Sequence, residues 1–525
     1  MRVFLPLLPS VILALFAASL LLLRIFRPHF RYFWMLAVGG SLLAWLSVLF
    51  LRFWLPTGLD ILPWKPTFLF PISPALLLDR ISWPYALALA TLALAATLSD
   101  ISGSTETQRG DWVGSLSFTA LGILAALSGN PITLMLAWSA LDLIELIILI
   151  IRVKPNNLRQ QVLITFSARV AGTFALIIAA GVGRELPATF DQIDPQSSIF
   201  LLLAAGLRLG VFPLRLPFLE QAPFERGLSV LFSLVPAGTS FMLLTRASAV
   251  IAPDPLGLVL LAFTGLALLF ASGSWAVSKS ELHGQPYWIL AFAALAIAAA
   301  LRGEELASLA FGMTGLLSGG LLFLFSTRQR SLFFIPILGL IGASMLPLTA
   351  SWQAVRLYSL PLPLILVLFL PAQALLLLGY LRHTLRPAEP PNRAERWIWI
   401  FYPLGLLLLP VTHILIAWFG NPMSRVETEW PQLIDSWPGF VVLLLSGAIF
   451  LAYQRGLRVS SNALRFFRRS LSLRWFYALF WKVYYWLGKS LDLVSRILEG
   501  EGGILWSLLL LIVLLTILTQ QNLGG

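Results

Sequence analysis

The chain has 525 residues, of which 58% are hydrophobic and only 11% are charged. Its mean hydropathy of +0.86 is higher than a soluble core with a solvated surface can hold, so the composition excludes a soluble globular protein. The net charge is +12, but the basic residues lie in loops beside apolar runs, which is typical of a membrane protein and not of a nucleic-acid-binding surface.

Apolar runs of about 20 residues, the length that crosses the hydrocarbon core of a bilayer, recur along the whole chain. They predict an all-α polytopic membrane protein with about 14–16 transmembrane helices. The first run lacks a small-residue cleavage site, so we interpret it as a span and not as a signal peptide. The expected spans are 3–24, 33–53, 84–99, 112–128, 131–151, 164–183, 197–216, 227–247, 256–275, 286–301, 304–325, 332–354, 360–381, 396–419, 437–454 and 503–520.

Basic residues gather in the loops that follow odd-numbered spans. By the positive-inside rule these loops face the cytoplasm, which predicts an outward-facing N-terminus in a bacterial-type inner membrane. The residues concerned are Arg24, Arg27, Arg31, Arg152, Lys154, Arg159, Arg328, Arg330, Arg382, Arg386, Arg393 and Arg396.

Two proline-containing spans suggest an internal repeat. Pro213 lies in the seventh expected span and Pro347 in the twelfth, and a separation of five spans gives two copies of opposite topology. Paired broken helices in inverted five-helix repeats indicate a transport site, although prolines are also common in membrane helices for other reasons. The predicted organisation is three N-terminal spans in 1–111, repeats in 112–247 and 256–381, and additional spans in 396–454.

The segment 461–498 mixes arginines and lysines with aromatic residues and precedes the final span, 503–520. Because charges recur about every turn, we expect an amphipathic helix along the cytoplasmic interface. An additional, weakly hydrophobic span is the alternative interpretation. The chain has no cysteine and four scattered histidines, so we expect no metal site and no cofactor, and any redox centre would belong to a partner subunit.

The stretch around the seventh and eighth spans resembles the antiporter-like subunits of respiratory complex I, membrane-bound hydrogenases and Mrp-type sodium/proton antiporters. The residues at the positions of the family's pattern are Arg208, Pro213, Arg215, Glu220, Ala222, Pro223, Ser229, "VPAG" at 235–238 and Arg246. Four further stretches are similar to other spans of the family. They are "LLLDRISWPYA" at 76–86, with Asp79 and Ser82, "GNPITLMLAWSALDLIEL" at 129–146, "GGLLFL" at 319–324 and "SMLPLTASW" at 344–352.

The resemblance implies a row of titratable residues at mid-membrane along which protons move, but this chain departs from the pattern. Ser139 stands where the family has a glutamate, and Arg215 stands where it has a histidine. Three family lysines are replaced here by Arg208, Pro236 and Gly319. An arginine stays charged at any accessible pH, so it relays protons poorly.

Two acids in the fifth span offer a replacement. Asp142 and Glu145 are three residues apart and therefore share a helix face. We expect them to exchange a proton or to anchor Arg169 or Arg208 across a helix interface. A fixed salt bridge that holds spans five, six and seven together is the alternative.

The candidate proton or ion pathway extends beyond this pair. His283 matches the polar entry to the family's tenth span. The position of the family's twelfth-span lysine falls near Val355, and Arg356 stands beside it. His413 belongs either to an exit path or to the structural core. The full set is Asp142, Glu145, Arg169, Arg208, Arg215, His283, Arg356 and His413, with helix breaks at Pro213 and Pro347. Glu220, Glu225 and Arg226 are expected to neutralise one another at the membrane surface.

The leading hypothesis for function is an antiporter-like membrane subunit of an energy-converting complex. It would be part of a proton-translocating NADH-quinone oxidoreductase-like or related assembly, would not be catalytic alone, and would translocate protons or cations within the lipid bilayer beside other membrane subunits. The alternative is a structural paralogue that no longer pumps and serves as a scaffold. A lipid-linked glycosyltransferase is a third class, but Glu427, Glu429 and Asp435 look like an ordinary solvated loop and not like its metal–phosphate site.

Overall fold

The computed structural model divides the chain into two units, Met1–Val459 and Ser460–Gly525. The second unit is described only at isolated positions, so most residues of the predicted interfacial helix 461–498 and of the final span 503–520 lie outside the described residues, and both elements stay predictions. The fold below is that of the first unit. The structure describes residues 2–27, 30, 32–60, 73–100, 106–153, 156–181, 189–190, 195–218, 224–247, 256–326, 332–386, 398–419, 431, 433–455, 482, 485, 486, 489, 508, 511 and 512.

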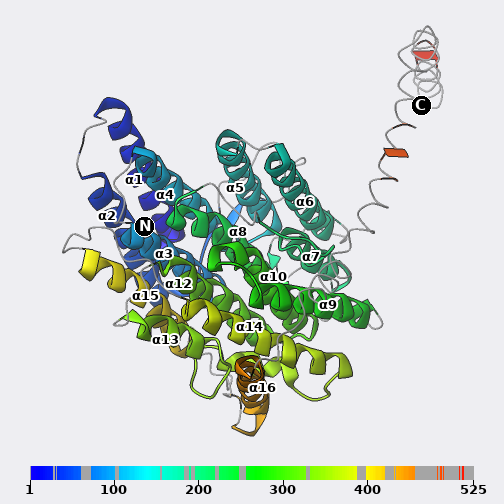
Figure 1. Cartoon of the computed structure of the whole chain (residues 1–525). Coiled ribbons are helices and arrows are strands. Elements are labelled where there is room, and N and C mark those ends of the chain that lie inside the picture. The colour runs from blue at the N-terminus through cyan, green and yellow to red at the C-terminus, as the bar shows by residue number, and fades with distance from the viewer. Residues whose placement is uncertain are drawn as a thin grey trace. The chain divides into compact units, whose positions relative to one another are not determined.

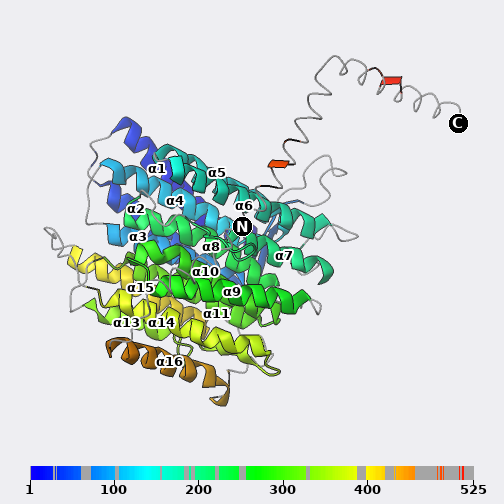
Figure 2. The same cartoon turned by 45° about the vertical axis from the view of Figure 1, so that its right-hand side comes forward.

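The first unit is a bundle of helices that run side by side (Figures 1 and 2). Among the described residues, 12 helices are long and apolar enough to cross a membrane. The α-helices are α1 (Leu8–Phe26), α2 (Phe33–Leu51), α3 (Ser82–Ser99), α4 (Glu106–Ala126), α5 (Pro131–Arg152), α6 (Asn156–Gly181), α7 (Pro195–Arg208), α8 (Arg226–Ala247), α9 (Leu256–Ala276), α10 (Glu281–Leu301), α11 (Glu305–Met313), α12 (Gly319–Leu324), α13 (Phe334–Gly342), α14 (Phe369–Thr384), α15 (Ile398–Phe419) and α16 (Trp437–Gln454).

These helices confirm the predicted all-α polytopic membrane protein. Helices α11 and α12 belong to one span, Glu305–Leu324, in which a π-helical turn at Thr314–Ser318 lies between them. Two predicted spans, 112–128 and 197–216, correspond to shorter apolar helices, Gly110–Ala126 and Ser198–Arg208. The predicted span 332–354 is not one continuous helix, because only Phe334–Gly342 is α-helical there.

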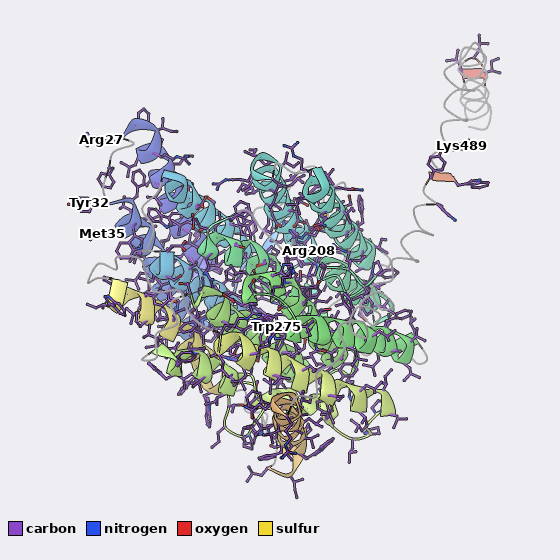
Figure 3. All side chains as sticks on the ribbon, viewed as in Figure 1. Arg27, Tyr32, Met35, Arg208, Trp275 and Lys489 are labelled. Carbon is purple, nitrogen blue, oxygen red and sulfur yellow. The ribbon has the colours of Figure 1, made fainter. Side chains whose placement is uncertain are left out.

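Burial separates a central group of helices from the helices around it. The most apolar windows of α3 and α10 are 100% buried inside the unit, whereas that of α16 is 22% buried. The exposed sides of the outer helices carry leucine, isoleucine and phenylalanine, as a surface in contact with lipid chains requires. In Figure 3, Arg208 and Trp275 lie inside the bundle, and Arg27, Tyr32 and Met35 lie at its margin.

Both predicted helix breaks fall in non-helical segments. Helix α7 ends at Arg208, and the chain then forms turns through 209–214 that contain Pro213. Helix α13 ends at Gly342, and the segment around Pro347 stays irregular until a 3-10 helix begins at Trp352. The inverted-repeat relation between the two halves remains a prediction.

A small β-hairpin was not expected from the hydropathy pattern. Strands β1 (Thr57–Asp60) and β2 (Ala75–Leu78) pair in antiparallel orientation. The hairpin lies on the junction between α4 and α5, where the Leu77 N–H donates to the Leu127 carbonyl. Asn130 begins α5 as its N-cap, with its side chain accepting a hydrogen bond from the Thr133 N–H at 2.9 Å.

An ion pair between Asp79 and Arg246 joins the segment before α3 to the last turn of α8. Asp79 lies outside the membrane-spanning helix α3. Asp79 accepts a hydrogen bond from the Ser82 N–H at 2.8 Å and lies 2.9 Å from the Arg246 guanidinium. Burial acts to raise the pKa of Asp79, but Arg246 and the Ser82 hydrogen bonds together hold it below its ordinary range. The Asp79 and Ser82 residues of the family-like motif therefore fix the chain's entry into α3.

We expect Gly172→Ala to destabilise the protein. A Cβ atom at Gly172 would lie 2.7 Å from both the Ala204 carbonyl oxygen and Cγ of Arg208, so α6 would have to move away from α7, at a cost of about 1–3 kcal/mol. Thermal unfolding in detergent, followed by tryptophan fluorescence, measures this as a lower Tm. Gly181→Ala in the same helix is the control, because nothing lies within 4 Å there; equal Tm values for the two variants would contradict this packing.

Candidate ion-pathway site

Two carboxylates form the base of the site. Asp142 and Glu145 lie on the inward face of α5 and are 3% and 5% exposed. On insertion scales, a charged side chain at the centre of a bilayer costs about 2.5–3.5 kcal/mol, so such groups are expected to pair inside a protein. Both acids have cationic partners that come from other helices.

Asp142 is held by Arg208, the last residue of α7. The Arg208 Nη1 and Nη2 atoms donate to the two carboxylate oxygens at 2.5 and 2.8 Å, which is a bidentate pairing that lysine cannot make. Because α7 stops at Arg208, the negative end of its helix dipole also favours this guanidinium. The end of α7 at Arg208 therefore adds the helix dipole to the Asp142 carboxylate as a favourable partner for the guanidinium.

Glu145 is held by Arg169 of α6. The Arg169 Nη1 atom donates a hydrogen bond to Glu145 Oε2 and also lies 3.6 Å from Asp142 Oδ1. Arg169 therefore stands between the two acids. The four side chains form one network of two positive and two negative charges, which we call the ion network.

Aromatic rings fix both guanidinium groups. The Arg208 Cζ atom lies 4.1 Å from the ring centroid of Trp138, and the Arg169 Cζ atom lies 4.9 Å from that of Phe218, both within cation–π range. Trp138 is itself oriented by a 3.0 Å hydrogen bond from its Nε1 to Thr239 Oγ1. The sequence draws attention to Trp138 through its motif but does not show that its partner is Arg208.

A cavity of about 40 Å³ adjoins the acidic side of the ion network. Because on the order of 10–15 Å³ of such space accommodates one water molecule, this cavity has room for a few. Leu149 and Phe224 line its far part, and Arg152 lies over the Phe224 ring at 5.6 Å. The cavity thus extends from the ion network toward the end of α5 that carries Arg152.

Two polar residues that the sequence analysis did not select also line the cavity. Gln285 of α10 donates a hydrogen bond from Nε2 to the Ser233 hydroxyl of α8. Gln285 lies two residues from the predicted His283, so the polar stretch at the start of α10 was the available signal. These neutral groups extend the polar lining of the cavity from α5 and α6 to α8 and α10.

The remaining predicted site residues lie elsewhere. Arg215 is in the turn after α7, where its Nη2 donates to the Leu207 carbonyl at 2.7 Å. His283 lies in the first turn of α10, and its backbone N–H donates to Ser280 Oγ. Arg356 donates from Nε to Gln353 in a 3-10 helix, and His413 is buried in α15. None of these four lines the cavity.

In the corner before α8, Arg226 pairs with Glu281 of α10 at 3.1 Å and donates to the Phe323 carbonyl at 2.8 Å. Glu220 lies outside the described residues, so the mutual neutralisation of Glu220, Glu225 and Arg226 stays a prediction. Arg226 therefore links the beginning of α8 to α10 and to the end of α12.

The same end of α8 contacts Asp100, which the sequence analysis did not select. The Gly227 N–H donates to Asp100 Oδ1 at 3.2 Å. Burial raises the pKa of Asp100 to about 7; the Gly227 hydrogen bond opposes this shift, and the nearby Glu225 and Asp111 carboxylates add to it. A protonatable carboxyl group thus lies where α3 meets α8.

Comparisons with known proteins show the fold. No family model and no curated protein matches this sequence. Among solved structures, a chain of the membrane-bound sulfane sulfur reductase, an archaeal respiratory membrane complex, aligns over 98% of this chain and 100% of its own length, with a TM-score of 0.66 at 15% identity.

Two further complexes contain chains of the same fold. A chain of the Mrp complex from Dietzia sp. DQ12-45-1b has a TM-score of 0.70 at 16% identity, and the match covers 98% of this chain and 63% of that one. A chain of respiratory complex I from Thermus thermophilus has a TM-score of 0.60 at 17% identity, with 85% and 100% covered. The resemblance to antiporter-like subunits is confirmed at the level of fold, and the protein is an integral membrane protein.

We expect Asp142→Asn to destabilise the protein strongly. Removal of this charge leaves Arg208 buried without its carboxylate partner, which typically costs about 3–5 kcal/mol. The free energy of unfolding in mixed micelles measures the loss. The double variant Asp142→Leu/Arg208→Met should recover part of it, because it removes both charges of the pair; a single variant as stable as the wild type would show that the pair is not needed.

Asp100 should make stability depend on pH. Since its pKa is raised to about 7 in the folded protein and lies near 4 in an unfolded chain, the folded state binds more protons between these values. Stability should therefore fall as pH rises from about 4 to about 7. Asp100→Asn removes this contribution, so the Tm difference between variant and wild type should grow across that window. A difference that does not change with pH would contradict the assignment.

Proposed function

We propose that this chain is an antiporter-like membrane subunit of a multi-subunit energy-converting complex, and that it translocates protons or other cations with energy from a partner's redox reaction or ion gradient. The observation that supports this most directly is the ion network beside a cavity at the end of a broken helix. Buried ionisable groups in a membrane protein mark ion or proton pathways by default. Broken helices mark the binding sites of many transporters.

The charges of the network favour a proton over a metal cation. Both oxygens of Asp142 are occupied by Arg208, and Arg169 lies against Glu145. A sodium ion would need several oxygen ligands and would be repelled by two guanidinium groups. The described residues contain no cluster of three or more side chains suited to a metal ion.

Glu145 is the group in the network that is best placed to exchange a proton. It lines the cavity, and its partner Arg169 already lies 3.6 Å from Asp142. When Glu145 takes up a proton from cavity water, Arg169 can turn fully toward Asp142; when Glu145 releases the proton, Arg169 returns. Arg169 and Arg208 remain charged throughout, so they position the carboxylates and do not themselves carry the proton.

The partners and the location follow from the same proposal. The solved neighbours are chains of multi-subunit membrane complexes, so we expect other membrane subunits to surround this chain and to supply the redox groups. The basic loops predict a bacterial-type inner membrane with the N-terminus outside. The cavity would then open toward the cytoplasmic side, where Arg152 lies.

Glu145→Gln tests the proposal in the assembled complex. We expect proton movement into membrane vesicles, followed with a pH-sensitive dye, to slow by about tenfold or more, because a positioned proton-transfer group contributes rate factors of ~10² or more. Glu145→Asp should retain part of the rate. Glu305→Gln is the matched control, since Glu305 pairs with the exposed Arg80 away from the cavity.

Assembly is measured in the same preparations. Wild-type pumping by an intact complex that carries Glu145→Gln would contradict the proposal and would support the structural paralogue instead. If the chain purifies alone and remains active as a transporter, its assignment to a complex is wrong.

A further inference from the structure

The second helix break has an unusual backbone. After α13, Met345 and Leu348 adopt φ values of +56° and +67°, a left-handed conformation that residues other than glycine rarely adopt. The Met345 N–H donates to the Ser351 hydroxyl oxygen at 2.9 Å. Such strain persists only where the surrounding structure imposes it, and it is concentrated at functional sites.

A second backbone irregularity lies on the helix next to this break. The π-helical turn Thr314–Ser318 interrupts the span between α11 and α12. Trp288 of α10 donates from Nε1 to the Gly315 carbonyl in this turn, at 3.0 Å. The Thr314 hydroxyl donates to the Ala310 carbonyl at 2.7 Å, so its oxygen lone pairs can still accept a hydrogen bond.

A cavity of about 20 Å³ lies between the break and the π-helical turn. Thr314, Met345 and Ser351 line it, together with Gln373 of α14. The Gln373 side chain is 4% exposed, and neither its Oε1 nor its Nε2 has a hydrogen-bond partner in the part of the chain that the structure describes. A buried amide in this state loses its hydration without compensation.

We propose that this cavity is a binding site for one or two water molecules that pair with the Gln373 amide and with the hydroxyls of Thr314 and Ser351. The volume suits this number, because on the order of 10–15 Å³ accommodates one water molecule. The amide offers both a donor and an acceptor, and the two hydroxyls supply further partners, which satisfies the two to four hydrogen bonds that a buried water needs.

The lining of the cavity is suited to water and not to a cation. None of its residues is charged, and the others are apolar, including Phe292, Phe311 and Val442. A cation there would have no carboxylate to balance it, and the Gln373 N–H groups would point their positive ends into the same small space. Water can accept from Nε2 and donate to Oε1.

The site gives the second half of the protein a hydrated position of a different chemical kind from the ion network. If protons cross the chain as proposed above, this water would form part of their path beside the break after α13, at a position without charged side chains. That consequence rests on the proposed function, whereas the presence of the water does not. A measurement of hydration alone therefore separates the two ideas.

Met345 provides a reporter within the cavity. Brief X-ray irradiation of the full chain in detergent produces hydroxyl radicals from bound water, and these oxidise adjacent methionine side chains, which mass spectrometry measures. Met345 is 3% exposed and Met242 of α8 is 0% exposed, so bulk solvent reaches neither well. We expect Met345 to be oxidised several-fold faster than Met242.

The variant Gln373→Leu removes the amide and should lower the Met345 rate to that of Met242. Thr314→Val, which keeps the side-chain volume, should give an intermediate rate. A low Met242 rate in every sample shows that the variant is folded. Equal rates for Met345 and Met242 in the wild type, or a Met345 rate that Gln373→Leu leaves unchanged, would overturn the proposal, whether or not the chain moves protons.

Discussion

The pairing of four buried charges is the constraint on which the rest of the site depends. Asp142, Glu145, Arg169 and Arg208 come from three helices and are almost completely removed from water. Each of these charges would be costly alone in a membrane interior, and each is compensated by at least one opposite charge in contact with it. Helices α5, α6 and α7 can therefore pack only in positions that keep these contacts together.

The interruption of α7 makes this arrangement possible. Because the helix ends at Arg208, its guanidinium is favoured by the negative end of the helix dipole as well as by the Asp142 carboxylate. Arg215 donates to the Leu207 carbonyl in the turn that follows. Gly172 allows α6 to approach the stem of Arg208 closely, and Trp138 covers its guanidinium face. The end of α7, the small residue Gly172 and the ring of Trp138 thus all stabilise the Arg208–Asp142 ion pair.

The two halves of the first unit use different chemistry at their helix breaks. The break after α7 is surrounded by charged side chains, whereas the cavity beside the break after α13 is lined by an amide, hydroxyls and apolar groups. The fold of the chain is shared with chains of respiratory and Mrp complexes. At the positions where the sequence resemblance implies lysines, this chain has Arg208, Pro236 and Gly319. A pathway through this chain would consequently depend on carboxylates and bound water more than on lysines.

The sequence by itself determined the class of protein, most of the spans and the positions of both breaks, because hydropathy, helix length and proline act locally along the chain. It also placed Asp142 and Glu145 on one helix face, since their spacing fixes their relative direction. Only the tertiary structure decided that Arg208 pairs with Asp142 and Arg169 with Glu145, across 66 and 24 residues. It alone revealed the β-hairpin, the Arg226–Glu281 pair and the Gln373 cavity, because such contacts depend on how each helix is rotated and packed, which no local pattern records.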